Sequence, residues 1–75
     1  PASAPWLVLE RDPAVYAQTR RRPEGDFDLE YRDGSADRHF GTVVADVSEV
    51  LDRLWGWLTD QPEWTANADW QRVRL

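Results

Sequence analysis

The chain has 75 residues, of which nine are basic, fourteen are acidic and none is cysteine. This length allows one small core, and the lack of cysteine excludes disulfide staples and cysteine-based zinc sites. The net charge of −5 repels phosphate, so nucleic acid is not expected as a partner. No apolar run approaches the roughly 20 residues of a membrane span, and no secretion signal is recognisable. A cytoplasmic protein without membrane contact is therefore expected.

The first part of the chain is predicted to form two strands. Residues 6–10 are a short apolar run that ends at the turn signal Asp12-Pro13. Residues 14–22 alternate between small or apolar and polar side chains, which favours a second strand. The same Asp-Pro pair could instead cap a helix and fill its first position, so a helix over 14–22 stays open. Residues 23–26 have the composition of a hairpin loop.

The clearest strand pattern covers residues 27–32, where Phe27, Leu29 and Tyr31 alternate with charged side chains. A turn over 33–37 separates this segment from residues 38–45, which are rich in aromatic and β-branched side chains. The two segments are predicted to pair in a hairpin. Residues 14–45 together are expected to form an antiparallel meander.

A helix is predicted over residues 46–59. Asp46 is a suitable N-cap, Glu49 follows at the spacing of a capping box, and Pro62 prevents much further extension. At 100° per residue, Trp55 and Trp57 lie about 80° to either side of the apolar stripe, and Gly56 lies on the exposed opposite face. The centre of that stripe is predicted at Val47, Leu51, Leu54 and Leu58.

Residues 65–69 read as a turn, and residues 70–75 alternate in a way that suits a short last strand. No repeat or linker divides the chain, so residues 1–75 are expected to form a single small domain with a flexible tail over 1–5. The expected fold class is α+β, with an antiparallel sheet of four to five strands and one helix packed across one face. The pattern does not predict the strand order.

His39 is the only histidine and therefore the one candidate general base. No cysteine nucleophile or Gly-x-Ser-x-Gly elbow accompanies it, and it is expected to be a surface residue on a strand. An enzyme or small-ligand site centred on His39, Asp28 and Glu30 is the least favoured alternative. A protein without catalytic activity or cofactor is expected.

Acidic side chains recur at every second residue of the strand over 27–32 and just before it. Asp26, Asp28 and Glu30 would face Arg20 and Arg22 if the 23–26 hairpin forms. Opposite charges at such positions form cross-strand pairs on a solvated surface, and this interpretation is favoured over paired catalytic carboxylates. The run from Arg20 to Arg22 is therefore not expected to bind phosphate.

Residues 33–37 have the oxygen-rich spacing of the first part of a calcium-binding loop. The remainder does not match, since Arg38 stands at the position of the invariant glycine and Val44 replaces the bidentate glutamate. A plain turn is predicted here, and no metal site is expected.

The chain contains five tryptophans. Trp6, Trp55 and Trp70 are expected in the core or at its rim. Trp57 and Trp64, at the helix end and in the loop after it, could form an exposed aromatic patch of the kind enriched at protein interfaces. These two residues and Tyr16 are the predicted protein-binding residues.

Several segments resemble small bacterial proteins of similar length. They are Tyr-Ala-Gln at 16–18, Glu-Tyr-Arg-Asp-Gly at 30–34, Arg-His-Phe at 38–40, the helix over 50–57 and two later tryptophans. The resemblance implies a compact α+β fold and no particular activity. In size, acidity and fold class the chain is also similar to bacterial immunity proteins, which inhibit other proteins.

The sequence therefore favours a non-enzymatic protein-binding module, such as an immunity-type inhibitor of a basic protein. An acidic surface accelerates encounter with a basic partner. The alternative is a homo-oligomeric structural domain, for example a homodimer, that pairs through a sheet edge or the outer helix face.

Overall fold

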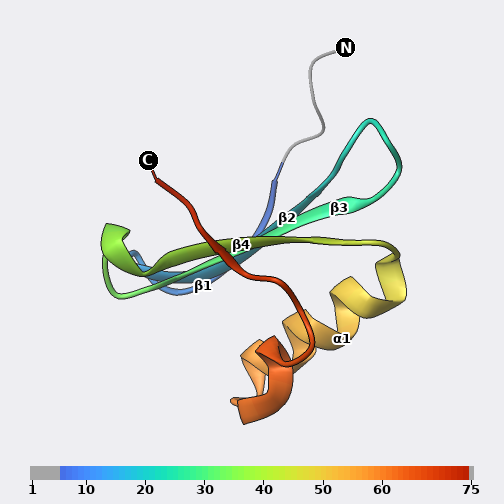
Figure 1. Ribbon diagram of the computed structural model, residues 1–75. Coiled ribbons are helices and arrows are strands. Elements are labelled where there is room, and N and C mark those ends of the chain that lie inside the picture. The colour runs from blue at the N-terminus through green and yellow to red at the C-terminus, as the bar shows by residue number, and fades with distance from the viewer. Residues whose placement is uncertain (1–5, 75) are drawn as a thin grey trace.

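The computed structural model describes residues 6–74, so the tail expected over residues 1–5 lies outside the described residues. Five strands form one antiparallel sheet in the order β1-β2-β3-β4-β5, and a single long helix, α1, lies against one face (Figure 1). The predicted α+β class is confirmed. The elements in chain order are β1 (Leu7–Asp12), β2 (Val15–Arg21), β3 (Phe27–Asp33), the 3-10 helix η1 (Ala36–Arg38), β4 (His39–Val44), α1 (Val47–Leu58), the 3-10 helix η2 (Pro62–Thr65) and β5 (Gln71–Arg72).

The segment that could have been a strand or a helix is strand β2, which pairs with β1 on one side and β3 on the other. Alternation prevails because the loop after β2 forms a hairpin turn, in which Gly25 has a φ of 101°. Gly34, in the turn after β3, has a φ of 99°, and glycine adopts both values without steric cost. The next hairpin aligns Tyr31 with Phe40 and Arg32 with His39, as the predicted pairing of these segments requires.

The core lies between α1 and the sheet face that carries Leu29, which is fully buried. Cross-strand partners share a face, so the pairing of Leu29 with Thr19 brings this threonine to the same side. The Thr19 hydroxyl donates a hydrogen bond of 2.7 Å to the carbonyl of Asp28, which satisfies a buried polar group. The buried hydrophobic residues are Ala17, Leu29, Val44, Val50, Leu54 and Trp57.

Helix α1 begins and ends at the predicted signals. The Asp46 carboxylate accepts hydrogen bonds from the Ser48 hydroxyl at 2.7 Å and the Glu49 backbone N–H at 3.0 Å. These bonds favour the charged form and hold the pKa of Asp46 below its usual value. At the other end, the Thr59 N–H donates to the carbonyl of Trp55, and the chain leaves the helix before Pro62.

The rotation of α1 about its own axis differs from the prediction. Val50, Leu54 and Trp57 face the sheet, whereas three members of the predicted stripe centre, Val47, Leu51 and Leu58, are exposed. The apolar residues of α1 cover an arc of about 160°, which is wider than the side that one sheet face can bury. The sequence pattern located this arc and its centre correctly, but the sheet buries one edge of the arc and leaves the centre exposed.

The C-terminal segment packs against the helix-covered face through aromatic rings. The centroids of Trp64 and Trp70 lie 4.8 and 5.0 Å from that of Tyr31, each edge to face. Burial raises the pKa of the Tyr31 hydroxyl, and the neighbouring Asp33 carboxylate raises it further. The last strand covers only residues 71–72, although the Val73 N–H still donates to the carbonyl of His39 at 2.8 Å.

Arg11 joins the edge strand β1 to the end of α1. Its guanidinium donates hydrogen bonds to the carbonyls of Trp57 and Leu58 at 2.7 and 2.8 Å, and to the Asp60 carboxylate at 2.8 Å. It also lies over the Trp57 ring, 4.7 Å from the centroid. A cation at this place satisfies carbonyls that have no partner inside the helix and complements the helix dipole.

Candidate functional site

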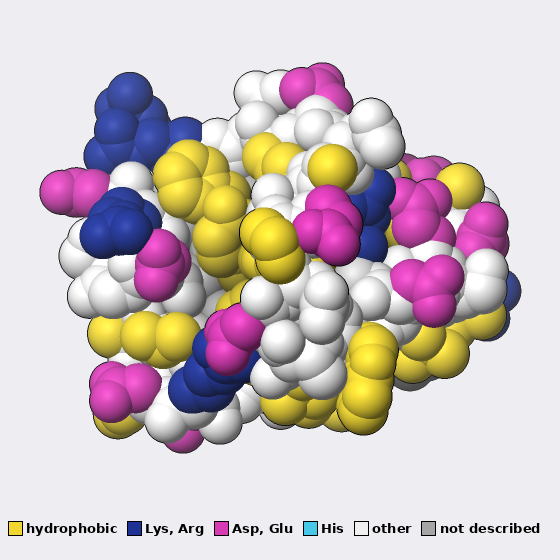
Figure 2. Space-filling model, turned by 90° about the horizontal axis from the view of Figure 1, so that it is seen from below, with side chains coloured by type: hydrophobic (Ala, Val, Ile, Leu, Met, Phe, Trp, Pro, Cys, Tyr) yellow, Lys and Arg dark blue, Asp and Glu magenta, His cyan; other side chains and the backbone are white. Residues whose placement is uncertain are grey.

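The most unusual surface feature is a line of large hydrophobic side chains on the outer side of α1. Its most exposed member is Trp55, with 67% of its surface accessible, so the expectation that this residue lies at the core rim is wrong. Figure 2 views this side of the molecule and shows hydrophobic side chains at the surface with acidic side chains between them. We call these four residues the exposed stripe: Val47, Leu51, Trp55 and Leu58.

A groove of about 460 Å³ lies between α1 and η2, and Trp55 lines it as well. At its base, η2 approaches α1 so closely that a Cβ atom on Gly56 would lie 2.7 Å from the Cβ of Trp64. Gly56 is therefore buried against Trp64, and the expectation that it faces solvent is wrong. We call this feature the α1–η2 groove; its lining also includes Glu49, Asp52, Arg53, Glu63 and Ala66.

The α1–η2 groove carries an excess of negative charge. Its one guanidinium, on Arg53, donates to the Glu49 carboxylate at 3.0 Å and to the Trp64 carbonyl at 2.7 Å. Only 11% of the Arg53 side chain is accessible, and its charge is balanced by the Glu49 carboxylate. Within residues 6–74, the carboxylates of Asp52 and Glu63 form no ion pair.

Most other arginines are engaged in the same way. Six of the nine form ion pairs with carboxylates of the chain. A seventh, Arg32, donates to His39 and lies over the Tyr16 ring. Because the positive groups are largely neutralised by neighbours, the surplus of carboxylates determines the charge of the remaining surface.

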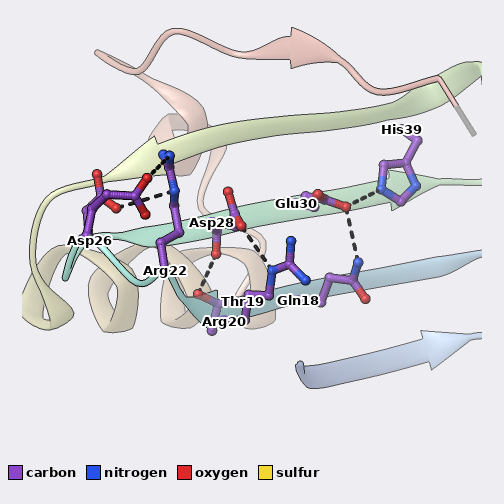
Figure 3. A network of polar contacts seen from close by, with 9 residues as sticks. Gln18, Thr19, Arg20, Arg22, Asp26, Asp28, Glu30 and His39 are labelled. Carbon is purple, nitrogen blue, oxygen red and sulfur yellow. Dashed lines mark hydrogen bonds and ion pairs between the residues drawn. The ribbon is translucent and has the colours of Figure 1, made fainter. Parts of the chain in front are cut away.

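The open face of the sheet, opposite α1, carries a polar cluster around His39. This residue is 1% exposed, so the expectation of a surface histidine is wrong. Its Nδ1 accepts a hydrogen bond of 3.2 Å from Nε of Arg32, which leaves the ring hydrogen on Nε2 to be donated to Glu30 at 2.9 Å. The Tyr16 ring packs edge to face against the imidazole, and Gln18 donates to the same Glu30 oxygen at 3.1 Å. Figure 3 shows Glu30 between Gln18 and His39 on three adjacent strands.

Charged residues near the 23–26 hairpin form the predicted ion pairs. Arg20 donates to Asp28 at 3.1 Å, and Arg22 lies 3.5 Å from Asp26 (Figure 3). Arg20 also lies over the Trp6 ring, 4.5 Å from the centroid. Both guanidiniums are therefore held within the chain rather than presented as a cluster.

The carboxylates of Asp28 and Glu30 border a second hollow, of about 510 Å³, beside β4 and β5. Glu30 accepts hydrogen bonds from His39 and Gln18, and Asp28 accepts one from Arg20, so both carboxylates already have partners within the chain. Among residues 6–74, no three histidine or acidic side chains are grouped so that they could hold a metal ion. The predicted turn after β3 contains η1, where Arg38 pairs with Asp33.

The three predicted protein-binding residues lie in separate places. Trp57 is only 7% exposed and belongs to the core, so it forms no exposed patch with Trp64. Trp64 is half-buried and lines the α1–η2 groove, whereas Tyr16 is half-buried on the open face of the sheet. A binding role for these residues stays a prediction, and of the three only Trp64 lies next to the exposed stripe.

Sequence reasoning missed Trp55 and Leu51 as exposed residues. A signal was present, because seven of the twelve residues of α1 are large and hydrophobic, more than one sheet face can cover. The sequence does not indicate which of these hydrophobic residues face the sheet and which remain exposed.

Comparisons with known proteins add no relative: no family model, curated protein or solved structure matches the chain. Within the part of the chain that the structure describes, no helix has the length and hydrophobicity needed to cross a bilayer.

Proposed function

We propose that this chain is a non-enzymatic protein-binding domain that contacts its partner through the exposed stripe and the adjoining α1–η2 groove. The observation that carries the proposal is the exposure of Trp55 and Leu51, 67% and 57%, in line on one side of a regular helix. Side chains of this size form a patch on the order of a few hundred Å², the size at which exposed patches often have a binding function. Tryptophan is also the residue most enriched among interface hot spots.

Charge favours a basic partner. The chain has a net charge of −5, and most of its arginines are engaged internally. A basic protein would be attracted over a distance of about 10 Å at moderate salt and would find unpaired carboxylates beside the stripe. An immunity-type inhibitor, acting in the cytoplasm on a basic protein, is one form that this function would take.

The His39 cluster gives no support to the catalytic alternative. Both ring nitrogens are engaged in hydrogen bonds inside the chain, and the imidazole has almost no accessible surface. A general base must reach a proton on a substrate, which this arrangement does not offer. We assign His39 a role in holding β2, β3 and β4 together.

The proposal is tested by affinity capture from the native host lysate, followed by purification of the retained protein and measurement of its Kd. We expect the Leu51→Ala/Trp55→Ala double variant to bind at least about tenfold more weakly than the wild type. The matched control is Val8→Ala/Val43→Ala, which removes two exposed hydrophobic side chains from the open face of the sheet, where Val8 pairs with Gln18 and Val43 with Asp28. Equal losses in the two variants, or none in either, would contradict the proposed surface. An association rate that does not fall with added salt would remove the electrostatic part.

A further inference from the structure

The chain has a recurrent way of covering tryptophan rings, which is to place a guanidinium over them. Arg11 lies 4.7 Å from the Trp57 centroid, and Arg20 lies 4.5 Å from the Trp6 centroid. In both cases the arginine also pairs with a carboxylate nearby, Asp60 and Asp28 respectively. The stacked cation and its acidic partner therefore occur together, which is the arrangement in which a cation–π contact and an ion pair support one another.

Trp55 shares the α1–η2 groove with two carboxylates, but no cation among residues 6–74 is stacked on its ring. It lines the α1–η2 groove together with Asp52 and Glu63, whose carboxylates form no ion pair within residues 6–74. No guanidinium of the described residues lies over its ring. The one arginine in the groove, Arg53, is held by Glu49 and by the Trp64 carbonyl and is nearly buried.

The shape of the groove suits a side chain that enters from outside. The groove is open to solvent, with a volume of about 460 Å³, and its base is apolar because Gly56 and Trp64 form it. The aliphatic part of an arginine would pack on this base, while the guanidinium stacks on Trp55 and meets the free carboxylates at the rim. The groove is continuous with the exposed stripe, since Trp55 belongs to both.

We infer that the α1–η2 groove receives an arginine side chain of the partner protein, stacked on Trp55 and paired with Asp52 and Glu63. This inference rests on the proposed protein-binding function and names the chemistry by which the partner is recognised. Arginine is preferred to lysine because its planar guanidinium can stack and donate to two carboxylates at once. A second copy of the chain is a poorer occupant, because it carries the same net charge of −5 and seven of its nine arginines are already engaged within the chain.

The test uses the full chain and a synthetic amphipathic peptide that has leucines at helical spacing and arginines on its polar face. Two matched peptides carry citrulline, the neutral isostere, or lysine in place of every arginine. We expect the arginine peptide to bind at least about tenfold more tightly than the citrulline peptide, with lysine in between. Binding is followed by calorimetry and by tryptophan emission, and the contribution of Trp55 is the difference between the emission changes of the wild type and the Trp55→Leu variant.

The preference should depend on the groove and not on the overall charge. Asp52→Asn/Glu63→Gln should remove most of the arginine-over-citrulline preference, and Trp55→Leu should reduce it while keeping an apolar contact. Glu24→Gln/Asp69→Asn changes the net charge equally at positions outside the groove and should leave the preference intact.

Three results would overturn the inference. They are no binding of the arginine peptide at millimolar concentration, equal binding of the citrulline peptide, and an unchanged preference in the Asp52/Glu63 variant. If the binding of a captured host protein requires Trp55 but not Asp52 and Glu63, the result supports the proposed function and contradicts the arginine site. Light scattering that shows a dimer abolished by Trp55→Leu would identify a second copy as the occupant and also overturn it.

Discussion

His39 is buried and Trp55 is exposed, although a polar imidazole is expected at the surface and a large hydrophobic indole in the core. The imidazole lies on the open face of the sheet and is almost fully buried, whereas the indole lies on the main helix and is the most exposed large hydrophobic side chain described. The difference comes from their neighbours. Tyr16, Arg32 and Glu30 on adjacent strands enclose His39. On α1, by contrast, η2 packs against Gly56 and leaves Trp55 exposed at the edge of the groove. Burial in this small chain thus depends on which segments adjoin a position more than on residue type.

The largest difference in stability is expected between variants that truncate two tryptophans of the same helix, one buried and one exposed. Trp57→Ala removes a core side chain and should lower the free energy of unfolding by about 3–5 kcal/mol. Trp55→Ala removes an exposed one and should change it by less than about 1 kcal/mol. Urea denaturation of both variants, followed by circular dichroism, measures the two values. Similar losses would mean that Trp55 is packed in solution.

Substitution of His39 is expected to have an intermediate effect on the free energy of unfolding. His39→Ala should cost about 2–3 kcal/mol, because it leaves a cavity and deprives Arg32 and Glu30 of a buried partner. The adjacent Arg38→Ala serves as the control, since its ion pair with Asp33 is exposed and worth at most about 1 kcal/mol. A chemical denaturation series would settle the matter, and equal values for the two variants would show that His39 is not enclosed.

Gly56→Ala gives the smallest effect, and its sign is the informative part. Helix propensity alone predicts a gain of about 1 kcal/mol for this substitution in an exposed helix position. The approach of Trp64 predicts a loss of about 1–2 kcal/mol instead, because the new methyl group would force η2 away from α1. The melting temperature decides between them, with Asp52→Ala on the exposed side of α1 as the propensity control. A stabilised Gly56→Ala variant would show that the α1–η2 groove is wider than described.

Local patterns were sufficient to predict most elements of the fold. The alternation around Leu29, the hairpin signals and the cap at Asp46 act over a few residues, so the sequence alone indicates them. The strand order is the simplest one, in which each strand pairs with the next, although no local signal required it.

The candidate site could not be predicted, because each of its features depends on how a separate structural element packs against it. Gly56 is buried only because η2 returns to it, and the enclosure of His39 requires β2 and β3 at its side. The exposure of Leu51 follows from how α1 is rotated on the sheet, which an apolar arc of about 160° does not determine. The hydrophobic periodicity of a sequence indicates which residues share a face of a helix or strand, but not which other segment packs against that face.

The contacts of Arg11 also have a consequence for the order of folding. The hairpins of the meander bring together residues close in sequence, whereas Arg11 bonds to groups 46, 47 and 49 residues away. Such long loops close late, so the contact between Arg11 and the end of α1 should form after the β1–β2 hairpin and should open before the sheet does. As an edge strand, β1 is then expected to exchange its amide hydrogens with solvent faster than β3, and Arg11→Ala should widen that gap while the rest of the sheet keeps its protection.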